Sequence, residues 1–211
     1  MSQAVKRKLD EDVKWRTEEI ALIKKSALRK DQTALTKVVQ RRYSVPSMYA
    51  IWEGFIITAF STYVEELNLL AVPVSGLQRN LLAFNLFKTF SLYEPPKDYT
   101  KRVTLAESIR EHMKNVGKYS TPIETNSNVD YNELMFLMKR FAISAEGLEE
   151  YKSPLMKMIS LRNKIAHGQR DVNVTEKNVN EFSLLIEGLM GEVAIRINEA
   201  LENKAYLISS S

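Results

Sequence analysis

The segment "LRNKIAHG" contains three side chains that together could do acid–base chemistry on a phosphate: Arg162, Asn163 and His167. Arginine is permanently charged and binds phosphate oxygens through a planar fork of donors. Histidine titrates near neutral pH, so it can accept and return a proton. Cleavage of RNA without a metal needs one group that takes the 2′-OH proton, one that protonates the leaving 5′-oxygen, and a cation that stabilises the phosphorane.

The segment is expected to form the last turns of a helix. Ser153 and Pro154 have the order of an N-cap followed by a first-turn proline, and Gly168 is typical of the position just beyond a helix C-terminus. Within this helix the apolar residues recur at spacings of three and four, as Leu155, Met158, Ile159, Ile165 and Ala166.

Arg162 occupies the position where this apolar stripe requires one more apolar residue. Asn163 and His167 are four residues apart and therefore share a face of the helix. Five residues separate Arg162 from His167, which is about 140° around the axis. The long arginine can therefore bend towards the histidine, although direct contact is not required.

The spacing R-x-x-x-x-H is weak evidence by itself, because an ordinary helix can carry a surface arginine and a capping histidine. The misplaced Arg162 favours a functional site over that alternative. Lys164 and Arg170 flank the segment and are predicted to contact RNA phosphates. The basic run at 37–42 either contacts the RNA backbone or forms an ordinary solvated face.

Glu53 lies in a nearly all-apolar helical stretch, and a buried carboxylate needs a partner. We expect it to support the site by meeting a cation, with Arg162 as the first choice and His167 as the second. The alternative is a purely structural ion pair with Arg41, Arg42 or another cation.

Gly54 follows Glu53 and predicts close helix packing, because glycine weakens a helix by up to about 1 kcal/mol. Several aromatic residues at helical spacing could stack on bases, but the spacing is more typical of a core. These residues are Trp52, Phe55, Phe84, Phe87 and Phe90.

The composition narrows the remaining chemistry. The 211 residues include no cysteine and two histidines that are far apart in the sequence, so we predict neither a metal site nor a cofactor. No phosphate-binding loop, dinucleotide fingerprint or HExxH motif occurs. The net charge of +4 is compatible with a polyanionic partner such as RNA.

The chain is expected to be a soluble cytoplasmic protein without membrane contact. Its first residues are charged throughout and lack the apolar core of a signal peptide. The longest apolar stretch, "YAIWEGFIITAFSTYV", is too short to span a membrane and contains Glu53.

Helical spacing dominates the chain and predicts an all-α bundle in a single domain over 1–211. Residues 1–45 form an N-terminal helical segment for which the sequence gives fewer signals. The first helix is expected over about 5–28, and the second after "YSVPSM", with Ser44 or Ser47 as its cap and Pro46 at its start. A third is expected after Ser75, a fourth over about 102–116 and a fifth over about 131–141. The sixth should end at Gly168, and the last should begin near Thr175. The polar run 126–128 is expected to cap the fifth helix.

Four stretches of the chain resemble one known family. "LRNKIAHG" resembles the motif of the HEPN superfamily. That motif consists of an arginine, a polar residue, any three residues and a histidine. "MYAIWEGFIITAFSTYVEEL" is similar to the block YAxWEGF of the MAE-type HEPN-like nucleases. "IETNSNVDYNELMFLMKRFAI" and "FSLLIEGLMGEVAIRINEALENKAYL" resemble that family's I-x-T-x-SNL segment and its last helix and tail.

These matches occur in the family's order and cover roughly residues 48–207. Val129 stands where leucine is usual, and Ile51 stands where the family often has histidine. Neither departure touches the motif. The resemblance implies that Arg162 and His167 are the catalytic pair and that Asn163 is the polar residue between them.

The resemblance also implies a HEPN-type helical bundle with additional helices, acting as a metal-independent endoribonuclease. It further implies a homodimer in which two copies of the motif share one cleft, and products with 2′,3′-cyclic phosphate and 5′-OH ends. Such a protein would serve as the toxic effector of a bacterial toxin–antitoxin or phage-defence system, held by an antitoxin or another partner protein. The alternatives are a non-catalytic HEPN module that binds RNA, a nucleotide or a protein, and a plain helical interaction protein.

Overall fold

The computed structural model describes residues 2–90, 92, 94, 96–125 and 128–208. Over these residues it is an all-α protein with two isolated β-bridges and no strand, so the predicted fold class is confirmed. The helices are α1 (Ser2–Ala27), α2 (Ala34–Leu70), α3 (Arg79–Thr89), α4 (Tyr99–His112), α5 (Tyr131–Arg140), α6 (Lys152–Ala166) and α7 (Glu176–Glu202). Two short 3₁₀ helices, η1 (Val74–Gly76) and η2 (Leu148–Tyr151), connect them.

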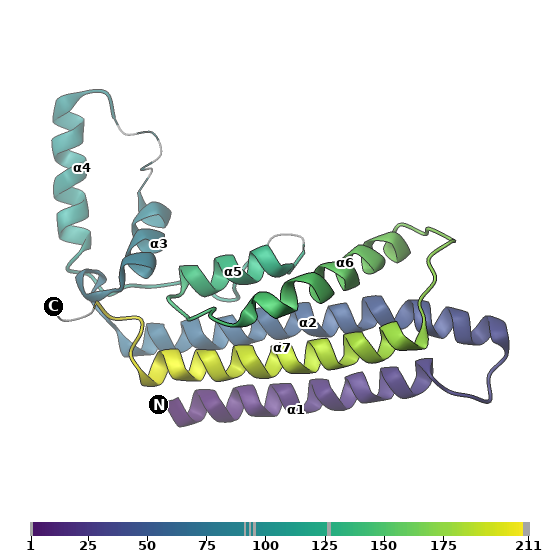
Figure 1. Ribbon diagram of the computed structural model, residues 1–211. Coiled ribbons are helices and arrows are strands. Elements are labelled where there is room, and N and C mark those ends of the chain that lie inside the picture. Colours follow the sequence, from purple (N-terminus) through teal and green to yellow (C-terminus); the bar gives the residue numbers. More distant parts are fainter. Residues whose placement is uncertain (1, 91, 93, 95, 126–127, 209–211) are drawn as a thin grey trace.

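Three long helices, α1, α2 and α7, lie side by side and form the body of the molecule (Figure 1). The helix α6 packs on α2 and α7, and α5 packs beside α6. The predicted apolar stripe of α7 is buried along its whole length, which accounts for its central place. Its residues are Val179, Phe182, Ile186, Leu189, Val193 and Ile197.

The helix α2 is longer than the sequence indicates, and the prediction that it starts near Pro46 was wrong. It begins at Ala34, with the side chain of Thr33 as its cap, and Pro46 lies inside it. An interior proline removes one backbone hydrogen bond and typically costs about 3 kcal/mol. On either side of it, Ser44 Oγ and Ser47 Oγ donate to the carbonyl oxygens of Arg41 and Tyr43, at 2.7 and 2.9 Å.

Three other helix starts test the predicted caps. Thr175 caps α7 and forms a reciprocal capping box with Asn178, as expected near this residue. Ser153 does not cap α6, because η2 runs directly into that helix and Tyr151 is its first flanking residue. The cap of α5 is Asp130, whose Oδ1 accepts from the backbone of Glu133 at 2.9 Å. The cap expected at 126–128 falls partly on residues 126–127, outside the described residues.

The contact between α1 and α2 contains a buried ion pair. Arg16 is 7% exposed and donates to Asp12 at 2.9 Å and to the carbonyl oxygen of Ile51 at 3.0 Å. A Cβ on Gly54 would lie 3.0 Å from Arg16 Nη1. Gly54 therefore makes room for a side chain of the neighbouring helix, which is the close packing that the sequence predicted.

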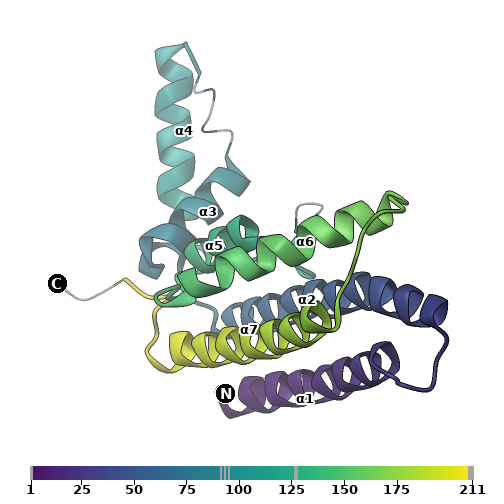
Figure 2. The same cartoon turned by 45° about the vertical axis from the view of Figure 1, so that its right-hand side comes forward.

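The helices α3 and α4 extend away from the three long helices, as both views show (Figures 1 and 2). No residue of α4 is buried. Its end is held by His112, whose Nε2 lies 2.7 Å from Asn85 Oδ1 and whose ring meets Phe90 edge-on. His112, the histidine outside the motif, therefore has a structural role.

Candidate functional site

The motif segment lies at the C-terminal end of α6, as predicted. The helix ends at Ala166, His167 follows as the C-cap, and its backbone N–H donates to the carbonyl oxygen of Asn163 at 2.9 Å. Gly168 then adopts a φ of 72°, in the left-handed region that glycine enters without strain. Arg162 and Asn163 are half-buried, whereas His167 is exposed.

The guanidinium of Arg162 lies over an aromatic ring. Its Cζ is 3.7 Å from the ring centroid of Tyr49 on α2, and its Nη1 donates to Asn163 Oδ1 at 2.9 Å. The ring face attracts the guanidinium through a cation–π interaction. This contact explains how an arginine occupies a position in an apolar stripe, because the neighbouring helix offers it an aromatic surface.

Tyr49 is itself fixed by two hydrogen bonds. It is 2% exposed, its hydroxyl donates to Glu53 Oε1 at 3.0 Å, and it accepts from the backbone N–H of Val129 at 2.8 Å. Burial raises the pKa of Tyr49 to about 12, against the opposing effect of the Val129 N–H and with the support of the Glu53 charge. The phenol therefore stays protonated near neutral pH and donates to the carboxylate.

The prediction that Glu53 meets a cation was wrong. Among the described residues its partner is the hydroxyl of Tyr49, which stands between the carboxylate and Arg162. The alternative partners are engaged elsewhere: Arg41 pairs with Glu176 at the start of α7, and Arg42 donates to backbone carbonyls after α6. Glu53 therefore supports the site indirectly, by orienting the ring beneath the arginine.

The loop after α6 is attached to α2 by Arg42. Its Nη2 donates to the carbonyl oxygen of Gln169 at 2.7 Å, and its Nη1 lies 3.4 Å from that of Arg170. This contact fixes the chain directly after His167. Part of the basic run at 37–42 therefore positions the motif and is not a free solvated face.

The exposed cations gather beside the motif. Lys164 and Arg170 line a hollow of about 400 Å³ formed by the last turns of α6 and the following loop, together with Leu161, Gln169, Asp171, Val172 and Asn173. Within the described part of the chain, the ring of His167 makes no hydrogen bond or ion pair. The end of α6 and its loop therefore carry an exposed histidine, a fixed guanidinium and two exposed cations, which are the kinds of group that bind and cleave a phosphodiester.

Other candidate positions are occupied by structural roles. Trp52 and Phe55 are fully buried, as a core requires, and Trp52 Nε1 donates to the carbonyl oxygen of Val129 at 2.8 Å. No cluster of three or more histidine, aspartate or glutamate side chains that could hold a metal ion occurs within the described ranges.

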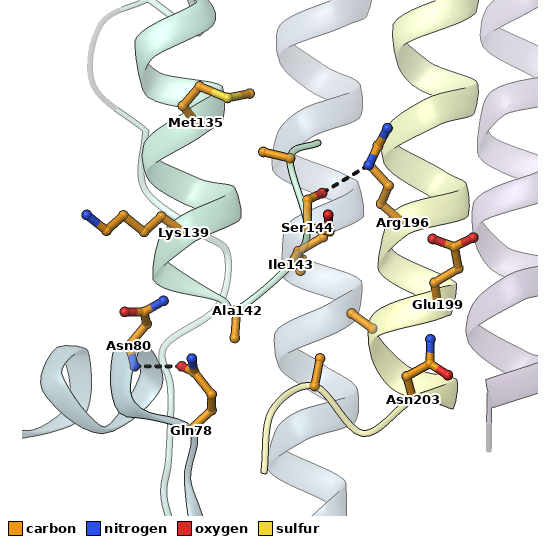
Figure 3. A pocket seen from close by; sticks show the side chains of 13 residues that line it. Gln78, Asn80, Met135, Lys139, Ala142, Ile143, Ser144, Arg196, Glu199 and Asn203 are labelled. Atoms are coloured by element: carbon orange, nitrogen blue, oxygen red, sulfur yellow. Dashed lines mark hydrogen bonds between the residues drawn. The ribbon is translucent and has the colours of Figure 1, made fainter. Parts of the chain in front are cut away.

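A second hollow, of about 490 Å³, lies at the other end of the bundle, beside the C-terminal turns of α5 and α7 (Figure 3). Its arginine, Arg196, is already engaged, since it donates to the carbonyl oxygen of Ser144 at 3.3 Å and to Glu192 at 3.1 Å. This hollow lies at the C-terminal end of α7, whereas the motif lies near the N-terminal end of that helix. The motif end is therefore the better candidate for chemistry.

The sequence did not single out Tyr49, and it suggested Arg42 only as a partner of Glu53 or as part of a basic run. A signal for Tyr49 was present, because it precedes Glu53 by four residues and so shares its helical face. No local signal identifies Arg42, because its acceptors are backbone carbonyls that become neighbours only in the folded chain.

The fold and the site together define an all-α protein that presents an arginine–histidine motif at the end of a helix. A model of the MAE_28990-like HEPN family matches residues 5–206, so the chain belongs to that HEPN family. No curated protein and no solved structure is significantly similar to it. Among the helices that the described residues form, none combines the length and the apolar character needed to cross a membrane.

Proposed function

We propose that the protein is a metal-independent endoribonuclease whose catalytic residues are Arg162, Asn163 and His167. The observation that carries the proposal is the fixed position of Arg162 on the ring of Tyr49, with the exposed His167 following on the last turn. A guanidinium held in advance stabilises developing charge without reorganisation. HEPN membership, which includes many ribonucleases, supports the same conclusion.

The proposed reaction is transfer of the phosphoryl group to the neighbouring 2′-oxygen. His167 of one copy takes the 2′-OH proton, and the oxygen attacks phosphorus as the bond to the 5′-oxygen breaks. His167 of the second copy donates a proton to that leaving oxygen. Arg162 stabilises the phosphorane, and the products carry 2′,3′-cyclic phosphate and 5′-OH ends.

A homodimer belongs to this proposal because the reaction uses both an acid and a base, whereas each chain has a single motif histidine. The first turns of α2 extend beyond α1 and α7 (Figures 1 and 2) and carry the exposed apolar residues Leu35, Val38, Val39 and Tyr43. Three of these, Leu35, Val38 and Val39, are seven, four and three residues before Arg42, so they share the face that reaches the motif loop. A second copy seated on this face would bring two motifs together.

Light scattering at micromolar concentration, with and without RNA, measures this assembly. A monomer under both conditions would contradict the shared cleft.

The cellular role that we propose is that of a toxic effector in a bacterial toxin–antitoxin or phage-defence system. Such an effector acts on RNA in the cytoplasm and is restrained by an antitoxin or another partner protein. This role is supported by HEPN family membership and by a candidate site whose residues could cleave RNA of any sequence. Growth of a host that expresses the wild type or the His167→Ala variant tests the role, and equal growth would contradict it.

The test of the activity compares wild type and His167→Ala on the same RNA, with a chelator present. Loss of a positioned acid or base typically lowers a rate by about 10²–10⁴-fold. Binding should change little, because affinity depends mainly on the number of phosphates neutralised. Mapping of the product ends identifies the cyclic phosphate, and the rate should decline at both acidic and alkaline pH. Binding without cleavage by the wild type would instead favour a non-catalytic RNA-binding module.

A further inference from the structure

A third hollow, of about 660 Å³, lies between α3, α5 and the segment 120–125. Its walls carry aromatic rings together with both signs of charge: Phe84 and Lys88 on α3, Glu124 in the segment, and Glu133, Phe136 and Arg140 on α5. None of these residues has a role in the motif.

Arg140 is held in this hollow without a hydrogen bond to any described residue. Its Cζ lies 4.6 Å from the ring centroid of Phe84 and 4.3 Å from that of Phe136, so the guanidinium stands between two rings. Its Nε is buried and has no acceptor among the described residues. Burial also lowers the pKa of Arg140, against the effect of Glu133. Because no described residue accepts a hydrogen bond from this guanidinium, its remaining N–H donors can bind an acceptor from outside the chain.

The rest of the hollow specifies what kind of group would supply that acceptor. Phe136 is 48% exposed, so part of its ring is open to a ligand although Arg140 lies over it. Glu124 supplies an acceptor, and Lys88, which donates to Ser120 Oγ at 2.5 Å, supplies a cation. A purely anionic ligand would meet the two carboxylates. A flat group with donors and acceptors along its edge satisfies both signs of charge.

The hollow is close to the candidate catalytic site. Thr125 lines it, and four residues later Val129 donates to the hydroxyl of Tyr49 beneath Arg162. A chain of four residues spans at most about 14 Å, so the two positions lie within that distance along the surface of the bundle. A short single-stranded RNA could therefore occupy both.

We propose that this hollow binds an unpaired nucleobase of the RNA, with guanine preferred. The base would stack on Phe136, Arg140 would donate to its O6 and N7, and a carboxylate would accept from its amino edge. Arginine matches the O6 and N7 pair of guanine better than any edge of the other bases. Stacking itself tolerates every base, so the preference would come from the arginine. The inference rests on the proposed ribonuclease function and adds a base-selecting contact to it.

The test uses the full-length His167→Ala protein, which keeps bound RNA intact, and two labelled pentaribonucleotides, UUGUU and UUUUU. Arg140→Met keeps the length and apolar character of the side chain. It should weaken binding of UUGUU by about tenfold and leave UUUUU nearly unchanged, because a bidentate base contact is lost. Lys164→Met should weaken both RNAs alike, since a phosphate contact carries no sequence information. Lys101→Met, on the exposed α4, is the matched control and should change neither.

A second measurement locates the base directly. RNA with 6-thioguanosine at the central position should cross-link to α5 or to the segment 120–125, as identified by mass spectrometry. Phe136→Leu, at a half-exposed position that leaves the core intact, should weaken binding of both RNAs through lost stacking. Cross-links confined to α6, or equal affinity of Arg140→Met and its parent for UUGUU, would overturn the proposal.

The outcomes separate this inference from the proposed activity. Cross-linking on α5 in a protein whose wild type cleaves no RNA would retain the base site and reject the nuclease. If the wild type cleaves RNA but binds UUGUU and UUUUU equally, the nuclease is retained and the base site is rejected. Competition by free GMP that removes the cross-link without any measurable affinity for UUGUU would assign the hollow to a free nucleotide and reject the RNA base.

Discussion

Tyr49 is the residue on which the geometry of the site depends. Its ring supports Arg162, and its hydroxyl joins Glu53 on its own helix to Val129 in the segment before α5. Three elements therefore meet at one phenol. Because each of its contacts is directional, the ring has one orientation, and the guanidinium that lies on it has one plane.

Replacement of Arg162 by lysine should separate activity from stability. A lysine keeps the charge, but its ammonium is a point charge that cannot lie flat on Tyr49 or grip two phosphate oxygens. We expect cleavage to fall about 10²-fold or more, while thermal unfolding shifts only slightly. Since Glu53 is not paired with Arg162, Arg162→Ala should cost only the cation–π contact and the hydrogen bond to Asn163, about 1–3 kcal/mol together. A lysine variant that cleaves like the wild type would show that charge alone is sufficient.

The raised pKa of Tyr49 predicts how stability changes in alkaline solution. The phenol titrates at about 10 in the unfolded chain and at about 12 in the folded one. The folded state therefore holds its proton more tightly, so this stabilisation is complete below pH 10 and is lost as the pH rises to 12. A shift of this size corresponds to about 2–3 kcal/mol.

Tyr49→Phe provides the comparison for this prediction. The variant should be less stable than the wild type at neutral pH, because Glu53 and the Val129 N–H lose their partner. Chemical denaturation at several pH values should show the difference shrinking between pH 10 and 12. A constant difference in the free energy of unfolding across this range would mean that the pKa of Tyr49 is the same in the folded and unfolded chains.

At the scale of elements, the contact between α1 and α2 depends on one buried cation. Arg16 satisfies Asp12 and the carbonyl oxygen of Ile51, and Gly54 leaves the space that its guanidinium fills. The glycine weakens α2 locally, but any Cβ there would press on a side chain that three hydrogen bonds hold in place.

In a double-mutant cycle at Gly54 and Arg16, the effect of Gly54→Ala on the free energy of unfolding should change sign with the residue at position 16. In the wild type, Gly54→Ala should lower the free energy of unfolding, because the new Cβ displaces Arg16 from its acceptors. Arg16→Met alone should cost about 1–3 kcal/mol, since the carbonyl oxygen of Ile51 loses its donor and Asp12 keeps only Trp15 Nε1 as a partner. In the Arg16→Met background, Gly54→Ala should instead stabilise by up to about 1 kcal/mol through helix propensity. Equal effects in both backgrounds would show that the two residues are not coupled.

The sequence predicts an element well where periodicity and a cap agree, and badly where a local rule is overridden by packing. The last helix was predicted from its apolar stripe and from Thr175, and both are as expected. The start of α2 was placed at Pro46, because proline usually begins a helix. The structure carries the helix through it, since the preceding turns are anchored by Arg41 and Arg42 to residues more than 120 positions away.

The candidate site divides in the same way. The helix of the motif, its end near Gly168 and the face shared by Asn163 and His167 follow from spacing alone. The partner of Glu53 does not, because a long-range cation was the generic expectation, whereas a tyrosine one turn away on the same helix satisfies the carboxylate first. Long-range contacts, such as those from Arg42 to Gln169 and from Val129 to Tyr49, cannot be predicted from the spacing of residues along one helix.

At the scale of the whole molecule, the motif and the uncovered part of α2 lie at one end of the bundle. The helix α6 covers the Tyr49 end of this face of α2, and the apolar residues Leu35, Val38 and Val39 continue the face beyond the end of α6. A two-fold pairing on this surface repeats each contact, so two motif loops would approach each other across the axis. The proposed acid and base would then come from different chains.

An inactive variant should therefore lower the activity of the wild type when the two are mixed. A dimer of the wild type with His167→Ala keeps a single motif histidine, so it lacks either the proposed acid or the proposed base. After subunit exchange of an equal mixture, about half of the dimers are mixed and about a quarter are wild type. RNA cleavage should then fall to about a quarter of that of the same total amount of wild type, whereas independent chains would retain about half. Val39→Asp in the wild type should itself reduce cleavage, because a charge at this exposed apolar position opposes pairing. If the mixture keeps half of the activity while light scattering shows mixed dimers, one histidine is sufficient and the shared cleft is wrong.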